Sequence, residues 1–160
     1  MRATRSLLTV ILLPVFACQP SAGASEATVA SQDAAVCPVR ESVQPSSRLP
    51  YSAAVRAGES VFFSGKIGAT EETRAMTDGR VAAETRNIME AFSALFDEMG
   101  MGFEDVVKGV VYLDNIEDYG EMNGVYGEYF PSDPPARVAL SVDKLPGNAA
   151  LEISFVSVCR

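Results

Sequence analysis

Residues 134–142 read PPARVALSV and residues 145–153 read LPGNAALEI, and these two segments carry the pattern that decides the fold. A double proline leads into a short apolar strand with a single arginine, Arg137. The next strand, otherwise apolar or small, holds a single glutamate, Glu152. Charged side chains rarely occupy such strands without a partner or a ligand. Arginine and glutamate also form a working pair, because a guanidinium binds a substrate carboxylate while a carboxylate moves water and protons.

Side-chain alternation assigns these two charges to a face of the sheet. We expect the apolar residues of both strands to lie under helices: Val138, Leu140, Val142, Leu151, Ile153 and Phe155. Arg137 and Glu152 then share the uncovered face, which is partly apolar and is expected to be covered by another copy of the chain. If the strands form a hairpin around Pro146-Gly147, the two charges lie about 13 Å apart. A direct ion pair within one chain is therefore not expected.

Hydrophobic periodicity predicts the elements around this segment. Strands are expected at 51–56, 60–67, 104–113, 136–143 and 149–158, and helices at 79–99 and 114–130. On the first helix the periodicity places Ile88, Phe92, Leu95, Phe96 and Met99 against the core, and Glu84, Arg86, Glu90 and Asp97 on the solvent side. The order ββαβαββ predicts an α+β domain in which two helices cover one face of a mixed sheet.

Composition excludes several classes of function. The sequence has no histidine, which excludes Ser-His-Asp and Cys-His catalysis and every histidine-ligated metal site. Its three cysteines lie far apart and form no CxxC motif, so a zinc site is not expected. The net charge is −8 and there is no basic stripe, which argues against nucleic acid as a partner.

The N-terminal part has the pattern of a bacterial export signal. In residues 1–18, two arginines precede an apolar run that is too short for a permanent membrane span. Cys18 ends a lipobox-like sequence and would be lipidated, whereas the competing reading is cleavage near residue 24. Both readings export the protein to the periplasm, with membrane contact only through a lipid anchor. Residues 19–47 are expected to form a flexible tether, and residues 48–160 the domain.

Other candidate site residues are ambiguous from the sequence alone. Ser64 and Gly65 offer a hydroxyl and an unhindered N–H to an anion, although this dipeptide also commonly ends a strand. Asn123 lies mid-helix, where asparagine is unfavourable, so it is either a ligand-facing or an ordinary surface residue.

Tyr51 begins the first strand, where packing alone would account for it. Cys37 and Cys159 flank the domain, and in an oxidising compartment they either pair or remain two small unpaired side chains.

Four segments resemble the RidA (YjgF-type) enamine/imine deaminases. They are PYSAAVRAGESVFFSGKIG at 50–68, ETRNIMEAFSALFDEMG at 84–100, VVKGVVYLDNIEDYGEMNGVYGEYF at 106–130 and PPARVALSVDKLPGNAALEISFVSV at 134–158. The resemblance covers essentially the whole domain, and the combination PAR…LP…EI is the most specific part of it. It implies a chorismate-mutase-like homotrimer whose sheets form a central barrel, with sites in the clefts between subunits.

The resemblance also implies roles and a reaction. Arg137 matches the arginine that binds the substrate carboxylate, and Glu152 matches the carboxylate that handles water and protons. Ser64, Asn123 and Tyr51 match residues lining the same cleft, beside Gly65. The implied reaction hydrolyses reactive 2-imino or 2-enamino acids, such as the 2-aminoacrylate pair, to 2-oxo acids and ammonium. No metal or organic cofactor is implied.

The sequence departs from the family pattern at two places and leaves other functions open. Lys66 stands where the family commonly has glutamine, and Val138-Ala139 replaces a region where some members have a cysteine. A non-catalytic trimer that binds small carboxylates or a partner protein is the alternative. A chorismate-mutase-like enzyme is a third reading, but its dicarboxylate substrate would need more cationic groups than Arg137 and Lys66.

Overall fold

The computed structural model describes residues 40–68 and 80–159. Its strands are β1 (Glu41–Pro45), β2 (Ser52–Ala57), β3 (Ser60–Phe63), β4 (Lys66–Ile67), β5 (Val106–Leu113), β6 (Ala136–Ser141) and β7 (Leu151–Val158). The helices are α2 (Arg80–Met99) and α3 (Tyr119–Glu128), with the short 3-10 turns η1 (Phe103–Asp105), η2 (Ile116–Asp118) and η3 (Pro146–Asn148). The predicted order is confirmed, with one additional strand, β1, and with the predicted strand 60–67 divided into β3 and β4.

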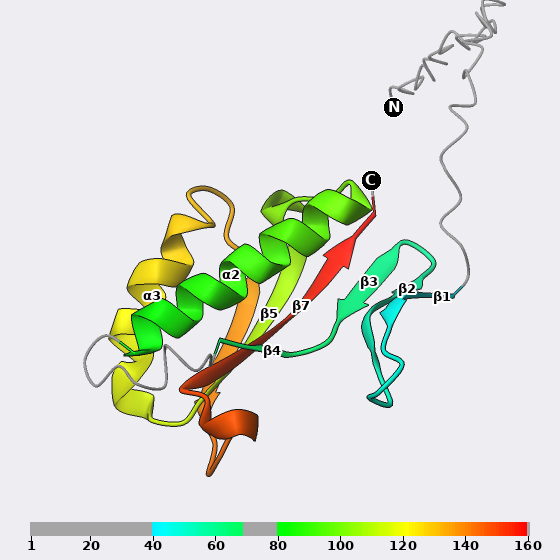
Figure 1. Ribbon diagram of the computed structural model, residues 1–160. Helices are drawn as coiled ribbons and strands as arrows, with labels where there is room; N and C mark the ends of the chain where they lie inside the picture. The colour runs from blue at the N-terminus through cyan, green and yellow to red at the C-terminus, as the bar shows by residue number, and fades with distance from the viewer. Residues whose placement is uncertain (1–39, 69–79, 160) are drawn as a thin grey trace, which may run out of the picture. The chain divides into compact units, whose positions relative to one another are not determined.

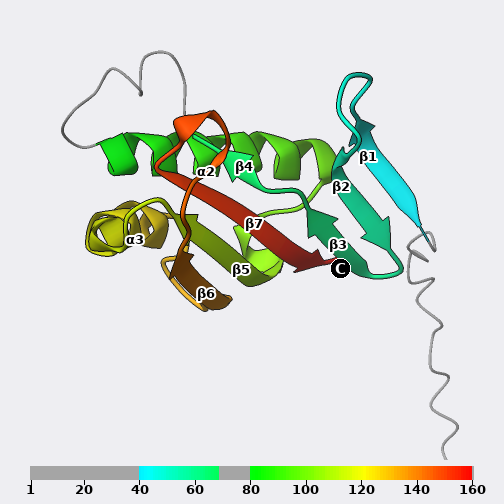
Figure 2. The ribbon, with the colours of Figure 1, turned by 90° about the horizontal axis from the view of Figure 1, so that it is seen from below.

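Strand β7 lies at the centre of the sheet. It pairs antiparallel with β3, β4 and β5, whereas β6 pairs with β5 in parallel and forms one edge (Figures 1 and 2). The predicted hairpin between the last two strands is therefore wrong, because β5 lies between them. The η3 turn, with Gly147 at a φ of 66°, directs the chain past the end of β5 instead of back along β6.

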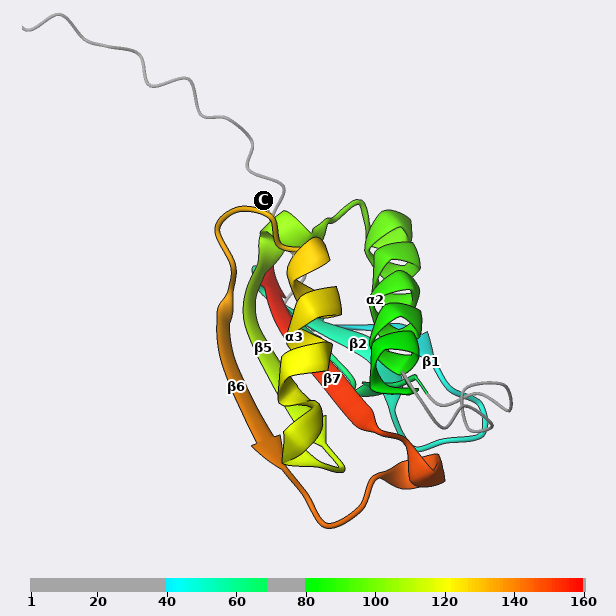
Figure 3. The ribbon, with the colours of Figure 1, turned by 90° about the vertical axis from the view of Figure 1, so that its left-hand side faces the viewer.

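Both helices cover one face of the sheet (Figure 3). Helix α2 buries the predicted stripe against an aromatic cluster. In this cluster the ring centroids of Phe92 and Phe155 are 4.7 Å apart, and those of Phe63 and Phe96 are 5.1 Å apart. Edge-on ring contacts of this kind stabilise a core beyond the burial of apolar area alone. The cluster fixes α2 over β7, and so fixes which side chains of β7 face the helices.

The prediction that Glu84 lies on the solvent side of α2 is wrong, because its side chain is fully buried. One carboxylate oxygen accepts from the Ala150 N–H at 2.7 Å and the other from Arg80 Nε at 2.9 Å. Arg80 also donates to the Asn148 carbonyl. The pair thereby joins the first turn of α2 to the segment that enters β7, and the hydrogen bonds offset the cost of burying a charge.

The side-chain orientations on β6 and β7 differ from those predicted. On β6, Val138 and Leu140 are 50% and 39% exposed, so they do not lie under the helices. Arg137, which alternates with them, contacts α3 instead. Leu151, Ile153 and Phe155 of β7 are buried as predicted, which leaves Glu152 on the face away from the helices. Arg137 and Glu152 therefore lie on opposite faces, and the prediction of a shared face is wrong.

At the other edge, β1 lies inside the segment 19–47 that we predicted to be a tether. It pairs antiparallel with β2, so the folded part begins at least as early as Glu41. The signal segment, Cys18 and Cys37 lie outside the described residues. Among the described residues, no helix is both long and apolar enough to cross a membrane.

The buried Glu84 yields a stability prediction. Glu84→Ala leaves the Ala150 N–H and the Arg80 guanidinium without their acceptor, and we expect a loss of about 2–4 kcal/mol in the free energy of unfolding. Glu84→Gln keeps an acceptor and is expected to lose less. Urea unfolding followed by circular dichroism measures both. Equal stability of Glu84→Ala and the wild type would contradict this role.

Candidate functional site

Glu152 borders a cavity of about 310 Å³ on the face of the sheet away from the helices. The residues that line this cavity come from β4, β7 and the loops next to them: Tyr51, Ser64, Gly65, Ile67, Pro146 and Glu152. A Cβ on Gly65 would lie 1.8 Å from a Glu152 carboxylate oxygen. Only glycine therefore lets the carboxylate lie against this part of the backbone, which is the structural reason for the Ser64-Gly65 dipeptide at this site.

The other polar side chains that line this cavity are hydroxyls. The Ser64 hydroxyl donates to the Ser52 carbonyl at 2.7 Å, so its oxygen is held in place with lone pairs available to a further donor. The Ser64 N–H donates to the Ala53 carbonyl. Tyr51 is 54% exposed at the rim. We call Tyr51, Ser64, Gly65 and Glu152 the glutamate half-site.

Arg137 is held by one face of α3. Its guanidinium donates to Asn123 Oδ1 at 2.5 Å and to the Tyr119 hydroxyl at 3.2 Å. It also lies over the Tyr126 ring, 4.5 Å from the ring centroid. A planar guanidinium stacks in this way more favourably than a lysine ammonium would. We call Tyr119, Asn123, Tyr126 and Arg137 the arginine half-site.

A second cavity of about 320 Å³ adjoins the arginine half-site. It is lined by Asn123, Tyr126 and Arg137 together with the double proline that precedes β6. Gly109 of β5 is the register partner of Arg137, and a Cβ there would lie 2.9 Å from the Tyr126 hydroxyl. The glycine thus gives the Tyr126 ring room beneath the guanidinium.

The same arrangement perturbs two tyrosines. Hydrogen bonds from Asn123 and then from Arg137, together with the charge of Arg137, hold the pKa of Tyr119 below its usual value. Burial raises the pKa of Tyr126 to about 12, against the opposing effect of the Arg137 charge. The guanidinium of Arg137 has five N–H groups, so its donations to Asn123 and Tyr119 leave others available to an anion.

One chain cannot bring both half-sites to a single small molecule. Arg137 of β6 is the register partner of Gly109 in β5. Glu152 of β7, on the opposite side of β5, is the register partner of Tyr112, three residues further along β5. Strand spacing then separates the two Cα atoms by about 14 Å, and the side chains point to opposite faces. The sequence argument against a direct ion pair holds, although the reason differs from the hairpin geometry that we expected.

Sequence analysis named Arg137 and Asn123 but missed their aromatic neighbours. Tyr119 and Tyr126 lie on the same face of α3 as Asn123, at spacings of four and three residues. That spacing was a usable signal, since residues three and four apart are neighbours on a helix. Among residues 40–68 and 80–159, no group of three or more cysteine, aspartate or glutamate side chains could hold a metal ion.

Comparison with known proteins assigns the chain to a family. A family model described as Endoribonuclease L-PSP matches residues 41–159. A RutC family protein of Pyrococcus abyssi is 37% identical over 108 residues, which cover 68% of this chain and 85% of that protein. The human 2-iminobutanoate/2-iminopropanoate deaminase is 34% identical over 109 residues, which cover 68% of this chain and 80% of that protein. The chain belongs to the YjgF/RidA family.

Solved structures of the YjgF/RidA family agree with this assignment. A YjgF family member of Neisseria meningitidis superposes with a TM-score of 0.65 at 27% identity, over 76% of this chain and 95% of that one. RidA from an Antarctic Psychrobacter gives a TM-score of 0.62 at 29% identity, over 76% and 98%. The family match begins at residue 41, which places β1 inside the YjgF/RidA domain.

The tyrosines of the arginine half-site report on Arg137. Because the Arg137 charge lowers the pKa of both Tyr119 and Tyr126, Arg137→Met is expected to raise the pKa of both tyrosines. A pH titration of the tyrosine rings by NMR measures the change. Val138→Ala, which points to the opposite face, is the matched control. A Tyr119 titration unmoved by Arg137→Met would contradict the geometry.

Proposed function

We propose that the protein hydrolyses small 2-imino and 2-enamino acids to 2-oxo acids and ammonium in a cleft shared by two copies of the chain. The observation that carries the proposal is the division of the site into two half-sites on opposite faces. The glutamate half-site of one copy and the arginine half-site of another together supply what the reaction needs. Relatives named as 2-iminobutanoate/2-iminopropanoate deaminases support this reaction class.

Exposed apolar residues support contact between copies. Val138 and Leu140 of β6 and Phe62 of β3 are 50%, 39% and 51% exposed, all on strands of one sheet. Side chains of this size on a sheet face favour burial against another surface. A closed cyclic assembly would give every copy the same contact and would repeat the cleft at each interface. We therefore propose a homo-oligomer, with the family trimer as the expected form.

The chemistry follows from the groups present. The Arg137 guanidinium binds the substrate carboxylate and holds the imine carbon near Glu152. The Glu152 carboxylate takes a proton from water as the water oxygen bonds to that carbon, and the imine nitrogen takes up a proton. The resulting carbinolamine loses ammonia as the hydroxyl proton leaves and the carbonyl forms, and the ammonia leaves as ammonium. An imine carbon is electrophilic, so no stronger nucleophile is required.

The alternative is a carboxylate-binding module without catalysis. Such a module would need the arginine half-site, but it would have no use for a carboxylate that only glycine at position 65 allows close to the backbone. An RNA substrate fits the net charge of −8 and the anionic Glu152 cavity poorly, because phosphates would meet like charge. Imine hydrolysis uses both half-sites, and we therefore favour it.

Co-expression of two inactive variants tests the shared cleft. Arg137→Ala and Glu152→Gln are each expected to lower turnover about 100-fold or more, since each removes one required group. Oligomers that contain both variants form intact clefts, and activity should recover to about one quarter of the wild type for random assembly. Imines generated by an amino-acid oxidase, with release of 2-oxo acid followed over time, provide the assay.

The controls separate the alternatives in this experiment. Co-expression of Arg137→Ala with an Arg137→Ala,Glu152→Gln double variant leaves no intact cleft and should remain inactive. Absence of recovery in the mixed oligomers, with both single variants folded, would contradict a shared site. A wild type no faster than buffer would contradict imine hydrolysis itself.

We further propose that the protein acts in the cell envelope. The arginine-then-apolar pattern of residues 1–18 supports export, and Cys18 supports a lipid anchor. Cells grown with labelled palmitate should then yield labelled protein, and Cys18→Ser should abolish the label, whereas an exported but unlabelled wild type would favour cleavage near residue 24. Unlabelled, full-length wild-type protein in the cytoplasmic fraction would contradict both routes of export.

A further inference from the structure

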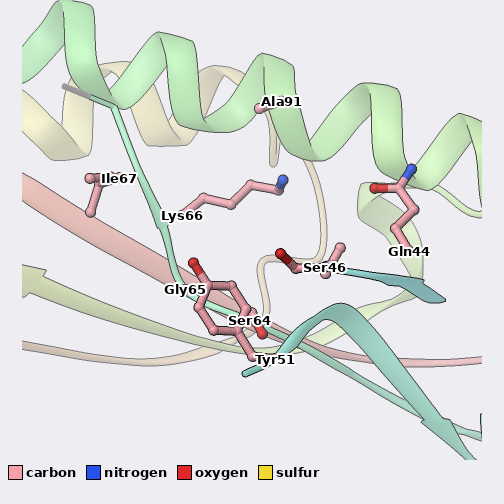
Figure 4. A pocket seen from close by; sticks show the side chains of 9 residues that line it. Gln44, Ser46, Tyr51, Ser64, Gly65, Lys66, Ile67 and Ala91 are labelled. Carbon is pink, nitrogen blue, oxygen red and sulfur yellow. The ribbon is translucent and has the colours of Figure 1, made fainter. Parts of the chain in front are cut away.

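A third cavity, distinct from those beside Glu152 and Arg137, lies next to the Ser64-Gly65 segment. It is bordered by β4, α2 and the connection from β1 to β2. Its volume is about 350 Å³, slightly larger than that of the cavity beside Glu152. Figure 4 shows the Lys66 side chain extending beneath α2 towards Ser46 and Gln44. Tyr51 and Ser64 line both cavities. The catalytic proposal uses the cavities beside Glu152 and Arg137, so the cavity that Lys66 enters has no assigned role.

Lys66 points into this cavity because of its register. It pairs with Ile153, whose side chain faces the helices, so the Lys66 stem also turns towards α2. There the ammonium lies over the Phe92 ring, 5.5 Å from the centroid. Among the described residues Lys66 forms no ion pair within 4.0 Å. A half-buried amine thus faces an open cavity without an acidic partner in contact.

The surroundings favour the neutral amine. Burial lowers the pKa of Lys66, and the charge of Glu98 on α2 only partly opposes this effect. Glu98 is itself engaged by the Gln44 side chain. A lysine that loses its charge readily becomes a nucleophile, which is the property that Schiff-base lysines share.

The hydroxyls at the cavity complete the requirements for a carbonyl ligand. Ser46 accepts from the backbone N–H of Leu49 at 2.9 Å, which fixes its oxygen at the cavity wall. Its own hydroxyl hydrogen, with that of Tyr51 nearby, can donate to a carboxylate or move a proton, whereas the Ser64 hydroxyl, which donates to the Ser52 carbonyl, offers lone pairs. A cavity of about 350 Å³ holds a molecule of a few heavy atoms. Small 2-oxo acids combine the carbonyl and the carboxylate that these groups would recognise.

We propose that Lys66 forms a reversible Schiff base with small 2-oxo acids in this cavity. The Lys66 nitrogen lone pair attacks the carbonyl carbon, a C–N bond forms, and the carbonyl oxygen takes up the proton that the nitrogen loses. The carbinolamine then loses water as the C=N bond forms, with no net oxidation or reduction. The biological source of the 2-oxo acid, though not the chemistry, rests on the proposed function of the neighbouring cavity.

The experiment compares the three lysines of the chain. Lys108 and Lys144 are exposed and serve as internal controls. The folded protein is incubated with pyruvate and cyanoborohydride, which reduces the C=N bond, and peptide mass spectrometry follows the carboxyethyl group on each lysine. We expect Lys66 to react faster than Lys108 and Lys144, because burial lowers the pKa of its amine and so raises the neutral fraction near neutral pH.

The outcome that would overturn the proposal is a Lys66 rate equal to or below those of Lys108 and Lys144. Unfolding in denaturant should make the three rates equal if the cavity is responsible. Glu98→Gln should accelerate labelling of Lys66, because Glu98 raises the pKa of this amine. If the rate of Lys66 labelling is unchanged both on unfolding and in Glu98→Gln, Lys66 reacts only because it is exposed, and the proposal is wrong.

Lys66→Arg keeps the positive charge without an amine that forms a Schiff base, and it is the matched control. Pyruvate binding that persists in Lys66→Arg, without any labelling of wild-type Lys66, would indicate a simple anion site and overturn the proposal. Because pyruvate is supplied directly, these results do not depend on imine hydrolysis. Failure of the deaminase assay and failure of the Lys66 experiment are therefore separate outcomes.

Discussion

The alternation of strand β7 is the constraint on which the rest of the structure depends. Leu151, Ile153 and Phe155 are held against the helices by the aromatic cluster, and a shift of one residue would bring Glu152 into that apolar core. With the register fixed, the Glu152 carboxylate must emerge on the open face, beside β4. The close approach to Gly65 follows from this position, because the carboxylate occupies the space that a Cβ would need. The same packing that stabilises the core therefore determines the geometry of the glutamate half-site.

The sequence could predict the elements that bury a single, strongly periodic face. The stripe on α2 and the buried half of β7 are of this kind, and both are as expected. Strand β6 is different, because it lies at an edge and has apolar residues on both faces. Alternation predicts that Arg137 and Val138 point to opposite faces of the sheet, but it does not predict which of them contacts α3. Helix α3 decides this through its tyrosines and Asn123, which provide acceptors and rings for a guanidinium but not for valine.

The insertion of β5 between β6 and β7 could not be predicted from the local pattern either. Consecutive strands with a short turn usually pair, and nothing in the Pro146-Gly147 turn forbids a hairpin. Strand β5 supplies the missing constraint, because its eight residues pair with β7 on one side and with β6 on the other, whereas the shorter β6 remains an edge. This strand order also strengthens the argument for a second copy of the chain, because it places Arg137 and Glu152 on opposite faces of the sheet. An apolar surface alone only favours association, whereas half-sites on opposite faces require it for any reaction that uses Arg137 and Glu152 together.

The break between β3 and β4 has a further consequence for how the two cavities are related. Ser64 and Gly65 interrupt the strand, and β4 then resumes with Lys66 directed to the helices and Ile67 next to Glu152. Ile67 therefore borders both cavities, whereas Lys66 lines only the one beneath α2. A substitution at position 66 changes the cavity beneath α2 while leaving the walls around Glu152 intact, because Lys66 does not line that cavity and the backbone of β4 is fixed by pairing with β7. A lysine can thus add a reactive amine beside the site without disturbing the carboxylate on which hydrolysis depends.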